Sequence, residues 1–172
     1  MSESFHIFQT TLGWVGILSS DKGLRRLSLP VSSFVEAYRQ LGISIEPDKT
    51  PPQSLIDIAE RLKRYFSGYK VTFSDELDIS GVTEFQLKVW KITQLIPYGE
   101  TRSYSWVAEH AGNVNAVRSV GQTLGGNPLP VIIPCHRVTA KNGGLGGYSG
   151  GIELKRYLLW LEASAFIRDR IS

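Results

Sequence analysis

The sequence predicts an α+β protein in two parts: an antiparallel sheet with helices, followed by a mostly helical part with a helix-turn-helix. Three observations support this prediction. Short β-prone runs separated by glycine turns fill the first 29 residues. Apolar residues then recur at helical spacing through most of the chain. Residues 71–81 are polar and irregular, so we expect two domains, residues 1–80 and 81–172.

Three strands are predicted near the N-terminus, over residues 5–10, 14–19 and 24–29. They are separated by Leu12-Gly13 and by Asp21-Lys22-Gly23, which have the composition of hairpin turns. An antiparallel meander is therefore expected.

Two helices are predicted to follow the meander. The first spans residues 34–41, and residues 47–52 form a proline-rich loop after it. The second runs from Leu55 and ends at Gly68, with five apolar residues at helical spacing. Since no polar residues of this part cluster into a chemical motif, we expect residues 1–80 to be scaffold.

The second part opens with Thr83-Glu84-Phe85-Gln86, which has the form of a capping box at the start of a helix. Ser103 then caps a short helix that Gly112 closes, and Asn113 begins a second short helix that ends at Gly125-Gly126. Two short helices joined through a glycine turn predict a helix-turn-helix. The signal is weak by itself, because many helical hairpins bind nothing.

The second of these short helices has unusual outer faces. We expect Val117, Val120, Gly121 and Leu124 to point inward, which leaves small residues and one long cation, Arg118, outside. A backbone with such small side chains can approach a partner surface closely. A solvated surface arginine is the simpler explanation of Arg118 if the helix stood alone.

Composition narrows the class of protein. The chain has 172 residues, with 42% hydrophobic and 20% charged residues, which excludes intrinsic disorder. It contains no apolar run of membrane-spanning length and no pattern typical of a signal peptide, so we expect a cytoplasmic protein without a membrane partner. Residues 1–80 contain 9 Lys+Arg against 10 Asp+Glu, and the rest contain 10 against 6, which suggests a polyanionic partner for the second part.

A single cysteine, Cys135, excludes an internal disulfide and a multi-cysteine metal site. It follows a strand-like apolar run, residues 131–133, and Pro134, so its thiol lies at a fixed exit from a buried segment. Only a thiolate attacks, so a reactive cysteine needs a base or a positive environment. The adjacent His136 is a candidate, with a water as the bridge, because neighbouring side chains of an extended chain point to opposite faces.

Glu162 is the candidate acid that orients His136, since it lies at the edge of the apolar face of a helix that starts at Ile152. The alternatives are a small buried hydrophobic cysteine and a structural histidine. A glycine run at residues 143–151, which includes Tyr148-Ser149, favours a catalytic role of Cys135 and His136 over these structural ones. The backbone of such a run can approach a flat ligand closely.

The segment Pro134-Cys135-His136-Arg137-Val138 resembles the O6-alkylguanine-DNA alkyltransferase (methylated-DNA–protein-cysteine methyltransferase) family. The matching context is Gly125-Gly126-Asn127-Pro128 before it, Tyr148-Ser149-Gly150-Gly151 after it, and upstream Ile96-Pro97-Tyr98-Gly99-Glu100-Thr101 and Ser103-Tyr104. The resemblance covers residues 85–162 at motif level. It implies a ribonuclease-H-like first domain and a winged-helix-like second domain that binds DNA and accepts the alkyl group.

The function that the resemblance implies is DNA repair by direct damage reversal. An O6-alkylguanine would be flipped out of double-stranded DNA through the minor groove, and its alkyl group transferred irreversibly to Cys135 in a single turnover. The protein would work as a monomer without a cofactor. No metal is expected, because members with a structural zinc hold it in the N-terminal half, where only His6 is available here.

The resemblance also implies roles for individual residues. Cys135 would be the acceptor, His136 the water-activating base, Glu162 its orienting acid, Asn127 the brace of the turn before the active site, and Tyr104 the hydroxyl that approaches the guanine. Arg118 would replace the extruded base in the stack, and the other expected DNA-binding residues are Ser103, Asn115, Ala116, Ser119 and Gly121. The expected substrate pocket consists of Tyr148, Ser149, Val138 and Trp90.

Three other functions remain open at this stage. A binding-only alkyltransferase-like protein would recognise the lesion without transfer, but in that group the cysteine is commonly replaced by tryptophan. A cysteine hydrolase would use Cys135 and His136 with DNA irrelevant, although its base normally lies far away in sequence. A plain helix-turn-helix regulator would not explain the Pro-Cys-His-Arg segment.

Overall fold

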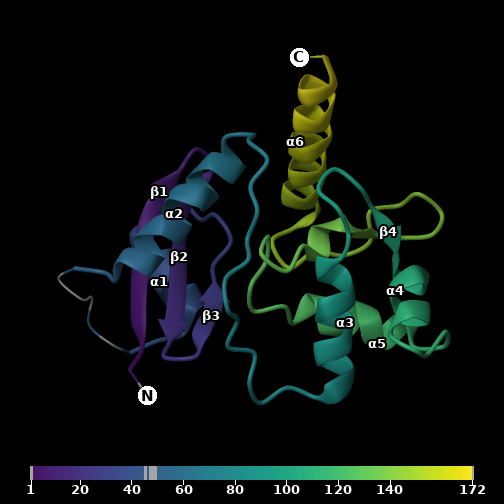
Figure 1. Ribbon diagram of the computed structural model, residues 1–172, viewed down its shortest axis with the longest axis horizontal. Coiled ribbons are helices and arrows are strands. Elements are labelled where there is room, and N and C mark those ends of the chain that lie inside the picture. The colour runs from purple at the N-terminus through teal and green to yellow at the C-terminus, as the bar shows by residue number, and fades with distance from the viewer. Residues whose placement is uncertain (1, 45, 47–49, 172) are drawn as a thin grey trace. The chain divides into compact units, whose positions relative to one another are not determined.

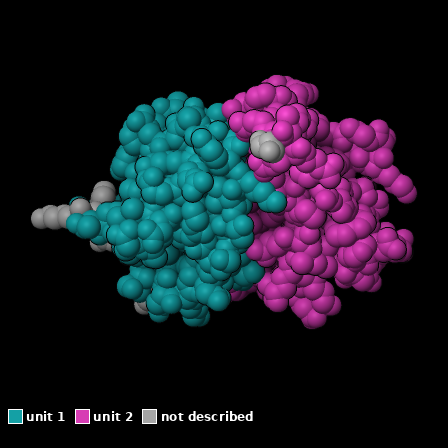
Figure 2. Space-filling model, turned by 45° about the horizontal axis from the view of Figure 1, so that its top comes forward, with its two compact units in different colours: residues 1–79 teal, residues 80–172 magenta. Residues whose placement is uncertain are grey.

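The computed structural model describes residues 2–44, 46 and 50–171. Within these residues it contains a three-stranded antiparallel sheet, a short parallel pair of strands and six α-helices, so the predicted α+β class is confirmed (Figure 1). The chain divides into two compact units, residues 1–79 and 80–172, which Figure 2 colours separately. The loop predicted at residues 47–52 lies partly outside the described residues.

The sheet of the first unit is the predicted meander, with β1 at Ser4–Thr10, β2 at Gly13–Ser20 and β3 at Gly23–Leu27. Both hairpin turns need glycine. Gly23 has φ +137°, and a Cβ there would lie 2.3 Å from the carbonyl oxygen of Glu76. β3 ends two residues earlier than predicted, and Ser28 just beyond it donates from its backbone to the carbonyl oxygen of Gly16 at 2.8 Å and accepts at its hydroxyl from the Gly16 nitrogen at 2.7 Å.

Two helices cover opposite faces of this sheet. In α1 (Phe34–Leu41), Ala37 and Leu41 pack with Phe5, Ile7 and Leu18 on one face. Since successive side chains of a strand alternate, Phe8 belongs to the other face. There α2 (Gln53–Phe66) places the Lys63 ammonium 5.8 Å from the Phe8 ring centroid.

The second unit begins with α3 (Glu84–Gln94), whose capping box between Thr83 and Gln86 is confirmed. The predicted helix-turn-helix follows as α4 (Tyr104–His110) and α5 (Val117–Gly125), and α3, α4 and α5 pack on one another. β4 (Arg102–Ser103) pairs in parallel with β5 (Val138–Thr139), and α6 (Ile152–Ile171) ends the described chain. Among the described helices, none combines the length and apolar character that crossing a bilayer requires.

The predicted start of α5 is wrong by four residues. The side-chain oxygen of Asn113 accepts a hydrogen bond from the backbone of Asn115 at 3.1 Å, and this local turn competes with helix formation. α5 therefore begins at Val117. Val117, predicted to be inward, is 39% exposed and lines the cavity described below.

The strand-like segment before the cysteine is buried but is not a strand. Pro130 and Pro134 on either side of it lack the N–H group that a sheet ladder needs. Val131 adopts φ +74°, and residues 135–137 form a short 3-10 helix, η1. Cys135 and His136 thus follow one another on a tight turn and not on an extended chain.

Candidate active site

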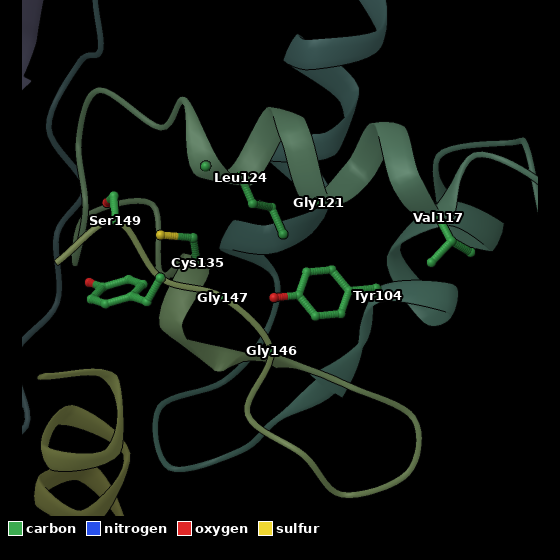
Figure 3. A pocket seen from close by; sticks show the side chains of 10 residues that line it. Tyr104, Val117, Gly121, Leu124, Cys135, Gly146, Gly147 and Ser149 are labelled. Atoms are coloured by element: carbon green, nitrogen blue, oxygen red, sulfur yellow. The ribbon is translucent and has the colours of Figure 1, made fainter. Parts of the chain in front are cut away.

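Cys135 borders a cavity of about 440 Å³ in the second unit (Figure 3). The walls come from the first residue of α4, from α5 and from the glycine-rich loop, and they consist of Tyr104, Val117, Gly121, Leu124, Gly125, Gly146, Gly147, Tyr148 and Ser149. The volume falls in the range of about 300–1,000 Å³ that is typical of small-molecule sites. Gly146 has φ +72°, and a Cβ on it would lie 2.5 Å from the Tyr104 hydroxyl, so a side chain there would disturb the cavity.

Asn127 fixes the segment that presents the thiol. Its side-chain nitrogen donates to the carbonyl oxygen of Ile133 at 2.8 Å and to Cys135 Sγ at 3.1 Å, and its side-chain oxygen accepts from the backbone of Leu129 at 2.9 Å. Three bonds from one amide replace the sheet pairing that this segment lacks.

The resting sulfur is a thiol. Cys135 is 5% exposed, and burial raises the pKa of its thiol. The hydrogen bond from Asn127 and the charge of Lys155 lower it by less than burial raises it. Reaction at neutral pH therefore requires a base that removes the proton when substrate is in place.

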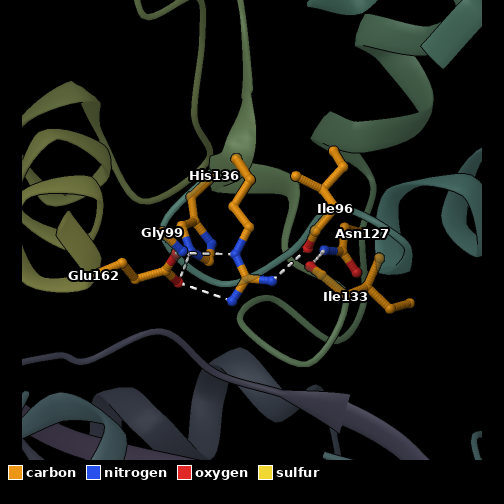
Figure 4. A network of polar contacts seen from close by, with 7 residues as sticks. Ile96, Gly99, Asn127, Ile133, His136 and Glu162 are labelled. Atoms are coloured by element: carbon orange, nitrogen blue, oxygen red, sulfur yellow. Dashed lines mark hydrogen bonds and ion pairs between the residues drawn. The ribbon is translucent and has the colours of Figure 1, made fainter. Parts of the chain in front are cut away.

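His136 and Glu162 form a buried pair next to the cysteine (Figure 4). His136 Nε2 lies 2.7 Å from Glu162 Oε1. Glu162 is only 1% exposed, and so lies deeper than the predicted edge of its helix. Its carboxylate also accepts hydrogen bonds from Arg137 Nε at 2.9 Å and Nη2 at 3.0 Å, and from the backbone nitrogen of Gly99 at 3.1 Å.

This network sets the charge of both members of the pair. Burial opposes ionisation of Glu162, but the hydrogen bonds from His136 and Arg137, together with the charge of Arg137, outweigh it and lower its pKa to about 2. Burial also lowers the pKa of His136, so its imidazole is neutral. With Nε2 assigned as donor to the carboxylate, Nδ1 is the basic nitrogen of this tautomer.

Lys155 is a functional candidate that the sequence analysis missed. Although fully buried, its ammonium donates to the carbonyl oxygens of Val138 at 2.7 Å and Gly147 at 3.1 Å, and to the Tyr104 hydroxyl at 3.4 Å. Burial lowers its pKa to about 8. Lys155 thereby connects α6 with β5 and with two segments that line the cavity, the glycine-rich loop and α4.

A sequence signal for Lys155 did exist. The face of α6 that is buried contains Lys155, Leu158, Glu162 and Ala165, at helical spacing, so two ionisable residues occupy core-facing positions. The sequence analysis expected Leu154, Leu158 and Leu161 to point inward, and of these Leu158 and Leu161 are buried.

The predicted DNA-binding residues are not all equally accessible. Asn115, Arg118 and Ser119 are exposed, whereas Ala116 is buried at the N-terminus of α5 and Gly121 lines the cavity. Ser103 is half-buried, and its hydroxyl caps α4 by accepting from the backbone of Trp106 at 3.0 Å.

The predicted pocket residues divide into two groups. Tyr148 and Ser149 line the cavity, and Val138 and Trp90 do not. Val138 is buried, and its carbonyl oxygen accepts from Lys155. Trp90 is also buried and donates to the carbonyl oxygen of Thr123 at 3.3 Å, because α3 packs behind α5.

Comparisons with known proteins agree with the motif resemblance. Residues 84–164 match the model of the 6-O-methylguanine DNA methyltransferase family, DNA binding domain. A methylated-DNA–protein-cysteine methyltransferase of Mycobacterium tuberculosis is 45% identical over 136 residues, which cover 77% of this chain and 82% of that protein. The constitutive methylated-DNA–protein-cysteine methyltransferase of Bacillus subtilis is 39% identical over 159 residues, covering 92% and 94% of the two chains.

Solved structures give the same result for the fold. The crystal structure of the O6-methylguanine methyltransferase of M. tuberculosis superposes with a TM-score of 0.77 at 36% identity, covering 95% of this chain and 94% of that one. The structure of the M. tuberculosis protein OGT in complex with DNA superposes with a TM-score of 0.76 at 37% identity, covering 94% of each chain.

Proposed function

The chain belongs to the methylated-DNA–protein-cysteine methyltransferase family, and we propose on this premise that Cys135 is the residue that receives the alkyl group. The family function is DNA repair by alkyl transfer from DNA to a cysteine of the protein. One observation supports Cys135 above all others: the only cysteine of the sequence borders the cavity and is followed directly by the buried His136–Glu162 pair.

The substrate of the proposal is O6-alkylguanine that has been flipped out of duplex DNA. A folded cavity cannot reach an alkyl group inside a stacked duplex, so the nucleotide must rotate out, at a cost of a few kcal/mol. The small residues of α5 suit close approach to the minor groove, and the exposed Arg118 suits the gap left in the stack. All the groups in this scheme come from one chain, which supports action as a monomer.

Transfer then proceeds as a single displacement. The thiol proton passes through a water to His136 Nδ1, and the Glu162 carboxylate stabilises the imidazolium that forms. Sulfur attacks the alkyl carbon, a carbon–sulfur bond forms and the bond from that carbon to O6 breaks. The departing guanine takes a proton from the Tyr104 hydroxyl, which burial keeps protonated, and the Lys155 ammonium, which donates to this oxygen at 3.4 Å, returns a proton to it. The thioether product is inert, so each molecule reacts once.

The proposal is tested by the intact mass of the protein after incubation with an oligonucleotide that contains O6-methylguanine. We expect the mass to increase once, by one methyl group, and peptide mapping to place that group on Cys135. Repeated turnover would instead support a hydrolase. Tight lesion binding with an unchanged mass would support a binding-only protein.

Arg118→Ala is expected to slow repair of the duplex by at least about tenfold, because the gap left by the flipped base is then empty. Transfer from free O6-benzylguanine, which needs no flipping, should keep its rate. Single-turnover rates on both substrates check this. Arg156→Ala is the matched control, since it removes an exposed arginine from α6, and it should leave both rates unchanged. If Arg118→Ala slowed transfer from both substrates by the same factor, a role of Arg118 in base flipping would be contradicted.

A further inference from the structure

Two long polar side chains, Arg118 and Gln122, belong to the part of the α5 surface that adjoins the cavity. Each follows directly after a residue that lines the cavity, Val117 and Gly121 respectively, and both are exposed. They lie four residues apart, so helical geometry places them on one stripe, about 5–6 Å from each other at Cβ. The sequence analysis singled out Arg118 and overlooked Gln122.

The surroundings of Gln122 are unusually bare. A Cβ built on Gly121 or on Gly125 meets no atom within 4 Å, so the helix presents open backbone on the cavity side of Gln122. A duplex that approaches this backbone closely must accommodate the Gln122 side chain. The side chain either contacts the groove or holds the duplex away from α5.

The amide of Gln122 is available for such a contact. Within the described part of the chain, its side chain forms no hydrogen bond, whereas its backbone carbonyl accepts from the backbone of Gly126 at 3.2 Å. A side-chain amide offers two donor hydrogens and one acceptor oxygen. Because it both donates and accepts, it can hydrogen-bond the edges of bases, which present donors and acceptors, whereas phosphate oxygens only accept.

We propose that Gln122 hydrogen-bonds the minor-groove edge of a base pair that flanks the flipped nucleotide. The inference rests on the proposed function. The amide would donate to purine N3 or pyrimidine O2, or accept from the 2-amino group of guanine. Long helical side chains lean toward the N-terminus of their helix, and this direction brings the amide of Gln122 toward Arg118. Gln122 therefore contacts the base pair next to the gap that Arg118 fills.

Single-turnover repair of O6-methylguanine duplexes by Gln122→Ala tests the proposal. We expect repair to slow about tenfold, the loss of one good base-edge contact. Gln122→Glu should slow repair further, because a carboxylate cannot donate a hydrogen bond and is repelled by the phosphates. Gln94→Ala, which removes an exposed glutamine at the end of α3, is the matched control and should repair at the wild-type rate.

Flanking bases that lack one minor-groove group identify the contact. Replacing a flanking guanine by inosine, or a flanking adenine by 3-deazaadenine, should slow the wild-type protein and leave Gln122→Ala unaffected. The proposal is overturned if Gln122→Ala repairs as fast as the wild type or faster, or if its loss is the same for all flanking bases. Transfer from free O6-benzylguanine separates the two hypotheses: if the wild-type protein accepts no alkyl group at all, the proposed function itself has failed.

Discussion

The Cys135→Ser protein is expected to bind O6-methylguanine duplexes and to take no methyl group from them. A serine hydroxyl is far less acidic than a thiol and a weaker nucleophile toward saturated carbon, so the same neutral His136 base does not produce enough alkoxide for the displacement. The substitution leaves the cavity walls in place, and the Asn127 side chain, which donates to Sγ at 3.1 Å, meets a hydroxyl oxygen instead. Intact mass after incubation and a lesion-DNA binding titration measure the two properties.

The wild-type protein supplies an internal check on this prediction. Since burial raises the thiol pKa, the thiolate fraction of Cys135 still increases with pH above neutrality. Transfer from free O6-benzylguanine should therefore accelerate as the pH rises, and Cys135→Ser should remain inactive throughout. Residual transfer by Cys135→Ser would mean that another residue accepts the alkyl group. Loss of lesion binding would mean that the sulfur is structural.

Local signals in the sequence predicted much of the fold. The caps at Thr83 and Ser103 and the glycines at the hairpin turns depend on chemistry within a few residues, and the structure contains them. The start of α5 was missed because the side chain of Asn113 can begin a helix or close a turn. Residues 131–133 were mistaken for a strand because burial and β-branched residues do not distinguish a strand from a buried turn.

The candidate site was predicted from a motif, and its supporting groups were not. Cys135, His136 and Glu162 follow from residue type and order, but the burial of Glu162 and its bonds to Arg137 depend on how α6 packs. Lys155 is the clearest case, because its helical spacing with Leu158 and Glu162 marks the buried face of α6, whereas the carbonyl oxygens that bind its ammonium belong to other segments. The ribonuclease-H-like and winged-helix-like descriptions of the two domains remain predictions.

Glu162→Gln is expected to have the largest effect on stability. The carboxylate accepts hydrogen bonds from two arginine nitrogens and from the backbone of Gly99, and it contacts the His136 ring, all in a buried site. A neutral amide leaves the Arg137 guanidinium without its counter-charge, and breaking a buried ion pair in this way costs about 3–5 kcal/mol. Urea unfolding at pH 7 should show this loss. Transfer should slow roughly 10²–10⁴-fold, because His136 loses the group that orients it as a base.

Acid titration separates this electrostatic effect from a packing defect. The pKa of Glu162 is about 2 in the folded protein against 4.5 for an ordinary glutamate, so its ionised form stabilises the fold above pH 4.5, and this contribution is lost as the pH falls toward 2. The stability gap between the wild type and Glu162→Gln should close over the same window. Glu100→Gln, which removes an exposed carboxylate paired with Arg102, should cost no more than about 1 kcal/mol at pH 7. If the difference in free energy of unfolding between the wild type and Glu162→Gln persists at pH 2, the loss is due to packing. The ionised Glu162 would then not be the group that holds the proton of His136 on Nε2.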